Sequence, residues 1–213
     1  MPSRLYLKQL ELGPMQNFVY LIGDTHSREA AVVDPGWEVK QILSVVQQEG
    51  YQLTKAFVTH HHFDHVGGLK ELLNAVDVPI YVHRDDAAFL RLERGTIKPV
   101  EGGEIVTVGE VPVTLMHTPG HTPGSQCLLV NGHLLSGDTL FIRACGRWDL
   151  PGGDPALLHQ SLMRLKALDE TTVLCPGHNY AEEPTSTIAE EKQRNPFLQP
   201  ANVQEFLRLV GRA

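Results

Sequence analysis

The sequence is poor in cysteine and has no long hydrophobic run. Its three cysteines, Cys127, Cys145 and Cys175, are odd in number and form no closely spaced metal-binding pair, so we expect reduced thiols and no thiolate metal site. The longest apolar runs are far too short to cross a bilayer, and Arg4 and Lys8 interrupt the segment where a signal peptide would be apolar. We therefore expect a cytoplasmic protein that has no membrane partner.

Positive charge is also scarce. Lys and Arg number 18 against 25 Asp and Glu, which gives a formal net charge of −7. A basic surface that would bind nucleic acid is therefore not expected. The hydrophobic fraction of 42% is enough for one sizeable core in 213 residues, so we expect residues 1–213 to form a single domain, as a monomer or a homodimer.

Apolar periodicity and turn residues predict strands that alternate with helices. This order favours an α/β fold in which two mixed sheets form the core and helices cover both outer faces, an αββα sandwich. Asn131-Gly132 lies between two apolar runs and predicts a hairpin turn. The predicted strands are 4–12, 17–22, 29–33, 56–59, 80–82, 104–108, 111–117, 126–130, 133–135 and 172–175, and the predicted helices are 39–49, 66–76, 85–94, 155–168, 187–194 and 203–210.

Histidine, in contrast, is abundant, with 11 residues in the chain. Four metal-competent side chains, His60, His62, Asp64 and His65, follow a short apolar run and precede a Gly-Gly pair. Imidazole and carboxylate ligands suit Zn, Fe or Mn. A polar loop with chance histidines is the plainer alternative, and three further loops argue against it.

Each of these loops places one His or Asp after a predicted strand, among turn residues. His121 lies between two Pro-Gly pairs, Asp138 follows Ser136-Gly137, and His178 follows Pro176-Gly177. In sheets covered by helices, loops beyond strand ends converge on one site. Seven candidate ligands are too many for one tetrahedral ion, but they suit two ions about 3.5–4 Å apart that share a carboxylate.

The pattern His60-x-His62-x-Asp64-His65, followed by the loops of His121, Asp138 and His178, resembles the signature of the metallo-β-lactamase superfamily. The resemblance implies an αββα fold and two divalent metal ions, with zinc favoured and iron or manganese as alternatives. It also implies a metal-bridging hydroxide as nucleophile, with Asp64 and Asp138 as catalytic carboxylates. The implied ligands are His60, His62 and His121 for the first ion and Asp64, His65 and His178 for the second, with Asp138 bridging.

Two neighbouring residues are expected to support these ligands. Asp34, in the early Asp34-Pro35-Gly36 loop, would orient a ligand histidine. His61 alternates with His60 and His62, so its side chain is expected to point away from the ions and to pack behind them.

Within the superfamily the chain resembles the glyoxalase II-like branch, through Thr118–Ser125, Gly137–Phe141 and Pro176–His178. The resemblance implies hydrolysis of a hydroxyacylglutathione thioester, a small anionic substrate. Cys145-Gly146-Arg147 resembles the glutathione-binding loop of that branch, and Tyr180 matches its tyrosine. Arg147, Tyr180 and Arg143 are therefore expected to bind substrate, although Arg143 could be an exposed loop cation and Tyr180 a packing residue.

The persulfide dioxygenases are an alternative resemblance, carried by Cys145-Gly146-Arg147-x-Asp149 and Asn195-Pro196. It implies a single iron at His60, His121 and Asp138 and oxidation of glutathione persulfide. The ligand set alone does not separate the two chemistries. A metal-holding scaffold is disfavoured by the complete ligand set, and a β-lactam substrate by the glyoxalase-like loops.

Overall fold

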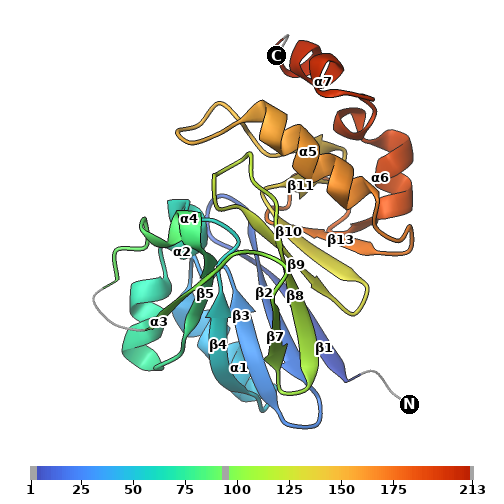
Figure 1. Ribbon diagram of the computed structural model, residues 1–213. Helices are drawn as coiled ribbons and strands as arrows, with labels where there is room; N and C mark the ends of the chain where they lie inside the picture. Colours follow the sequence, from blue (N-terminus) through green and yellow to red (C-terminus); the bar gives the residue numbers. More distant parts are fainter. Residues whose placement is uncertain (1–3, 93–95, 212–213) are drawn as a thin grey trace.

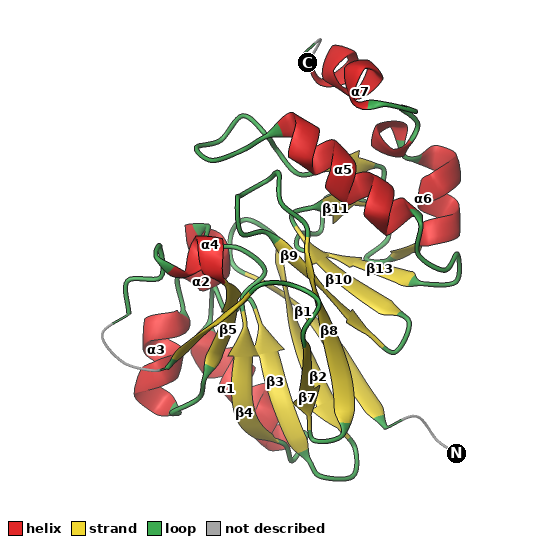
Figure 2. Cartoon of the chain, in the orientation of Figure 1, coloured by secondary structure: helices red, strands yellow, loops and turns green. Residues whose placement is uncertain are grey.

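Two six-stranded β-sheets pack face to face, and helices cover the outer face of each (Figures 1 and 2). The computed structural model describes residues 4–92 and 96–211 of the chain. The predicted αββα arrangement is confirmed. None of the helices within these ranges is long and apolar enough to cross a membrane.

The first sheet has the strand order β1-β2-β3-β4-β5-β6. Its first three strands are antiparallel, and β3 to β6 run parallel to one another. Leu21 on the sheet, Ile42 on α1 and Leu72 on α3 belong to one buried cluster that joins the sheet to its helices. The elements are β1 (Leu5–Leu12), β2 (Asn17–Asp24), β3 (Glu29–Val33), α1 (Val39–Gln48), β4 (Gln52–Phe57), α2 (Phe63–Val66), α3 (Leu69–Ala75), β5 (Ile80–His83), α4 (Arg84–Ala87) and β6 (Ile97–Val100).

The second sheet has the order β14-β13-β10-β9-β8-β7, and β11 and β12 form a small separate ribbon. Leu162 on α5 and Phe206 on α7 belong to the buried cluster on its outer face. The elements are β7 (Ile105–Val108), β8 (Val111–His117), β9 (Gln126–Val130), β10 (His133–Gly137), β11 (Leu140–Phe141), β12 (Ala144–Cys145), α5 (Pro155–Lys166), β13 (Val173–Pro176), β14 (Ser186–Thr187), α6 (Ile188–Arg194), η1 (Pro196–Leu198) and α7 (Val203–Val210).

Strand β2 shows how the layers are joined. Its alternate residues Val19 and Leu21 belong to the cluster under α1 and α3, whereas Phe18 and Tyr20 belong to the cluster that also holds Leu115 of the second sheet. Successive side chains of a strand point to opposite faces. A strand that is apolar on both faces is therefore buried between a helical layer and the other sheet.

Several predicted boundaries were wrong around the site. Strand β4 ends at Phe57 and not at residue 59, and the helix predicted at 66–76 is two short helices, α2 and α3, separated at Gly67-Gly68. The Pro35 loop approaches the chain closely at this point, and it requires glycine at position 68, because a Cβ there would lie 2.3 Å from the Pro35 carbonyl oxygen. Strands β6, β11, β12 and β14 were not predicted.

The helix predicted at 85–94 was also wrong. Only the single turn of α4, at 84–87, is helical, and residues 93–94 lie outside the described residues. Between 88 and 92 only Leu90 is buried, while Phe89 is 56% exposed. One buried side chain gives no continuous apolar helical face, so packing does not extend the helix.

Candidate metal centre

All seven predicted ligands meet at one end of the two sheets. His60 and His62 follow β4, and Asp64 and His65 lie on α2. The second sheet supplies the other three, from the β8–β9 loop, the end of β10 and the end of β13: these are His121, Asp138 and His178. Loops from both sheets are therefore needed to complete the centre.

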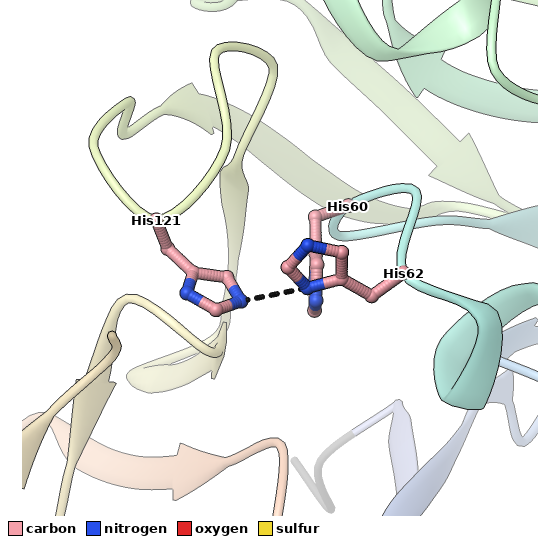
Figure 3. Close-up of side chains that lie close together, drawn as sticks. All are labelled: His60, His62 and His121. Carbon is pink, nitrogen blue, oxygen red and sulfur yellow. Dashed lines mark hydrogen bonds between the residues drawn. The ribbon is translucent and has the colours of Figure 1, made fainter. Parts of the chain in front are cut away.

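His60, His62 and His121 form the first group of potential ligands. One ring nitrogen from each lies within 4.8 Å of the others. The closest pair is Nδ1 of His62 and Nε2 of His121, which are 3.0 Å apart and are joined by the dashed line in Figure 3. The rings of His62 and His121 point toward each other from opposite loops, with His60 beside them.

Asp64, His65 and His178 form the second group, and all three are buried. Nε2 of His65 lies 3.2 Å from Nε2 of His178. The Oδ2 atom of Asp64 is 3.3 Å from each of these nitrogens. The group therefore offers one carboxylate oxygen and two imidazole nitrogens around a common point.

Asp138 lies between the two groups. Its Oδ1 is 3.3 Å from Nε2 of His65, and its Oδ2 is 3.4 Å from Nε2 of His178. Oδ2 is also 3.6 Å from Nε2 of His121, in the first group. This position is the one that a bridging carboxylate would occupy.

The histidine rings are oriented by hydrogen bonds on their far sides. Nδ1 of His121 donates to the Arg147 carbonyl at 2.7 Å, and Nδ1 of His178 donates to the Met15 carbonyl at 2.9 Å. A neutral imidazole that donates through Nδ1 keeps its lone pair on Nε2. Both Nε2 lone pairs are therefore directed into the centre.

The donor set fits divalent metal ions. Lone pairs that face each other at 3.0–3.2 Å, as in His62–His121 and His65–His178, repel unless a cation or proton lies between them. Two imidazoles on one tetrahedral zinc ion, with Zn–N of about 2.0–2.1 Å, place their nitrogens about 3.3 Å apart. In addition, the buried atoms His60 Nε2 and Asp138 Oδ1 make no hydrogen bond in the described part of the chain, as expected for atoms that bind a metal.

The electrostatics of the centre separate the two groups. Burial lowers the pKa of His62 to about 4 and holds that of His60 well below its usual value, so both rings are neutral. Burial also lowers the pKa of His65, but Asp138 and Asp34 outweigh it and raise that pKa well above its usual value. Positive charge is therefore favoured most strongly around His65.

Asp34, which the sequence predicts to orient a ligand histidine, lies against His65, one of the candidate ligands. Its Oδ2 is 2.9 Å from Nδ1 of His65, and the same oxygen accepts a hydrogen bond from the Thr59 hydroxyl at 2.6 Å. Its Oδ1 accepts from the Thr59 backbone amide at 2.7 Å. The carboxylate therefore fixes both the His65 ring and the start of the histidine loop.

His61 contacts Asp86 and Phe89, and the partner Asp86 was not predicted. Nδ1 of His61 lies 2.8 Å from the fully buried Asp86 carboxylate, and the His61 ring stacks on Phe89. Asp86 also accepts hydrogen bonds from the Thr122 hydroxyl and the Gly124 amide. Nothing local in the sequence distinguishes Asp86 from the charged residues beside it, because its partners are far away in the chain.

Asn17 was also missed. Its Nδ2 donates to Oδ2 of Asp64 at 2.9 Å, and its Oδ1 accepts from the Trp37 indole at 2.9 Å. The Asn17 side chain, at the start of β2, thus holds the candidate ligand Asp64 in place. A polar residue at the start of an otherwise apolar strand is the only signal in the sequence that could have indicated this role.

A pocket of about 530 Å³ opens onto both groups. Tyr180 lines it and stacks on His178, with ring centroids 4.7 Å apart. Arg147 also lines the pocket, but its guanidinium is paired with Asp149. Arg143 does not line it: the residue lies between β11 and β12, and its backbone amide donates to Glu191. The structure therefore brings two of the three predicted substrate residues to the pocket.

The fold and the two His/Asp groups define an αββα protein with a site for divalent metal ions. A sequence model described as the metallo-beta-lactamase superfamily matches residues 12–178. The chain belongs to this superfamily of metallo-hydrolases, as its motifs predicted.

Three relatives illustrate its place in the superfamily. A hydroxyacylglutathione hydrolase from Shewanella loihica is 34% identical, over 86% of this chain and 82% of the relative. The crystal structure of ETHE1 from Myxococcus xanthus has a TM-score of 0.88 and 31% identity, over 97% of this chain and 90% of that one. The crystal structure of TTHA1623 in a di-iron-bound form has a TM-score of 0.76 and 33% identity, over 90% of this chain and 100% of that one.

Proposed function

We propose that the protein is a metal-dependent thioester hydrolase. The observation that carries the proposal is Asp138, whose two carboxylate oxygens lie 3.3–3.6 Å from histidines of both ligand groups. The similarity to a hydroxyacylglutathione hydrolase over most of the chain supports this chemistry. The similarity to a di-iron protein supports two ions, and zinc is our first choice among the candidate metals.

When bound, two divalent ions would supply a hydroxide nucleophile at neutral pH and polarise the thioester carbonyl. The protein's own contribution is to place the donors. Asp64 and Asp138 would offset part of the charge of bound metal ions, and Asn17 fixes Asp64. The Arg147 and Met15 carbonyls hold His121 and His178 in the tautomer that directs Nε2 inward.

The test is metal content together with thioester hydrolysis. Protein purified without added metal is analysed for Zn, Fe and Mn, and S-lactoylglutathione and S-acetyl thioesters are supplied to the metal-loaded and chelated forms. About two ions per chain and chelator-sensitive release of free thiol are expected. A metal-loaded protein that releases thiol from none of these thioesters would contradict the proposal.

The alternative function is that of an iron-dependent persulfide dioxygenase. The similarity to ETHE1 supports it, and Asp138 Oδ2 lies 3.6 Å from His121 Nε2, so His60, His121 and Asp138 would offer a smaller donor set to a single iron ion. Oxygen uptake by the iron-loaded protein with glutathione persulfide would favour this function. Thiol release without oxygen uptake would exclude it.

A further inference from the structure

The pocket beside the metal centre has an apolar wall. Beside the metal-facing residues, its lining includes three aromatic rings, a thioether and aliphatic side chains. Phe63 is 65% exposed and Tyr180 is 60% exposed, so large apolar surface remains accessible at the pocket. The apolar and aromatic side chains are Met15, Phe63, Phe141, Leu150, Pro151 and Tyr180.

Free positive charge is missing from this wall. Among the described residues that line the pocket, Arg147 is the only Lys or Arg. Its Nε and Nη2 each donate to a different oxygen of Asp149, at 2.9 Å in both cases. Arg143, the other basic residue predicted to bind substrate, is outside the lining, and the nearby Lys166 donates to the Leu198 carbonyl.

This arrangement is unsuited to glutathione. Glutathione carries two carboxylates and one ammonium group. The transfer of charged groups from water to apolar surroundings is unfavourable. A substrate carboxylate that approached Arg147 would also approach the Asp149 carboxylate, which repels it. An uncharged hydrocarbon group has no such penalty. Its binding is favoured, because it removes the apolar surface of Phe63 and Met15 from water.

We propose that the pocket selects thioesters whose thiol half is an uncharged apolar or aromatic group, and not glutathione. The scissile carbonyl would lie at the metal centre, and the group on sulfur would cover Phe63 and Met15. This inference rests on the proposed thioester hydrolysis only for the position of the carbonyl. The preference itself is a property of the wall and can be measured by binding alone.

The experiment uses two unreactive probes in which the same ketone group replaces the thioester. S-acetonyl-2-phenylethanethiol and S-acetonylglutathione are titrated calorimetrically into the zinc-loaded protein. The phenylethyl probe should bind at least tenfold more tightly. Phe63→Ala or Met15→Ala should weaken the phenylethyl probe about fivefold or more and the glutathione probe less than twofold. The matched control is Ile105→Ala, because Ile105 is 63% exposed and lies outside the pocket lining.

Two results would overturn the inference. One is glutathione-probe binding that equals or exceeds phenylethyl binding. The other is selective weakening of the glutathione probe in Arg147→Gln, the effect expected of a carboxylate clamp. Hydrolysis of the two matching S-acetyl thioesters, measured in parallel, tests the proposed function separately. If no thiol is released but the phenylethyl probe still binds more tightly, the hydrolase function is rejected and the binding preference of the pocket stands.

Discussion

Nδ1 of His61 lies 2.8 Å from the carboxylate of Asp86, a side chain with no exposed surface. The same carboxylate accepts hydrogen bonds from Thr122 and Gly124, on either side of Pro123. Asp86 therefore connects the loop of His60 and His62 to the loop of His121. These loops carry the first group of ligands but belong to different sheets.

Asp86→Ala should weaken metal binding at the first group. Supporting residues of this kind change metal affinity by about 10–100-fold, and the unpaired buried donors should lower the free energy of unfolding by about 1–3 kcal/mol. Zinc competition with a chromogenic chelator and denaturant unfolding measure the two effects. The control is Asp85→Ala at the exposed neighbouring position, and equal behaviour of the two variants would contradict the prediction.

Asp34→Asn should weaken metal binding at the second group of candidate ligands more than at the first. Asp34 receives two donors from Thr59 and lies against His65, and an amide has one acceptor oxygen for these partners. Stepwise zinc titration should show that one of two binding steps weakens by about 10–100-fold. The exposed Asp77→Asn is the matched control. Equal weakening of both steps would count against the assignment of Asp34 to His65.

Asp138→Asn should remove the link between the groups. An amide lacks the negative charge and the second acceptor oxygen that two ions would share. We expect fewer than two ions per chain and at least about a 100-fold loss of thioester hydrolysis, with an unchanged circular dichroism spectrum. Retained turnover at full metal content would show that Asp138 does not bridge.

Gly146→Ala should disturb the centre through the backbone. An added Cβ would lie 1.7 Å from the Asp138 carbonyl oxygen and 3.2 Å from Nδ1 of His121. Overpacking of this kind destabilises a protein by about 1–3 kcal/mol, and it should also reduce the bound metal. The neighbouring Cys145→Ala, which removes atoms, should retain metal. The measurements are elemental analysis and thermal unfolding, and a fully metallated Gly146→Ala protein of unchanged stability would contradict the prediction.

Asp24→Asn should destabilise the protein more at neutral pH than in acid. Hydrogen bonds from Arg4 and from the Glu110 amide hold the pKa of Asp24 well below its usual value. A depressed pKa contributes stability above the unfolded pKa of about 3.9, and this contribution is lost as pH falls through the folded pKa. Because Arg4 is partly exposed, the substitution should lower the free energy of unfolding at pH 7 by about 1–2 kcal/mol. Denaturant unfolding of the original protein and the variant at pH 7 and pH 2 measures this effect. An equal difference in the free energy of unfolding at the two pH values would contradict the prediction.

Elements with a strong local pattern were predictable. The Asn131-Gly132 turn has the expected positive φ angles of 42° and 76°, because this dipeptide adopts the left-handed region readily. Helix α5 begins at Pro155, the predicted start, and Asp154 caps it through Ala156 and Leu157. Strands β6, β11, β12 and β14 were not predictable, since strands of two to four residues carry little periodicity of their own.

The sequence by itself determined the chemistry of the centre. The seven donors and their positions after strands depend on residue type and turn residues, which are local properties. Only the tertiary structure decided which groups support or neutralise them. Asp86 and Asn17 act on residues 25 or more positions away, and Asp149 pairs with Arg147, one of the predicted substrate residues. The reason is physical: burial and ion pairing depend on neighbours in space, and the order of residues does not specify those neighbours until the two sheets have packed.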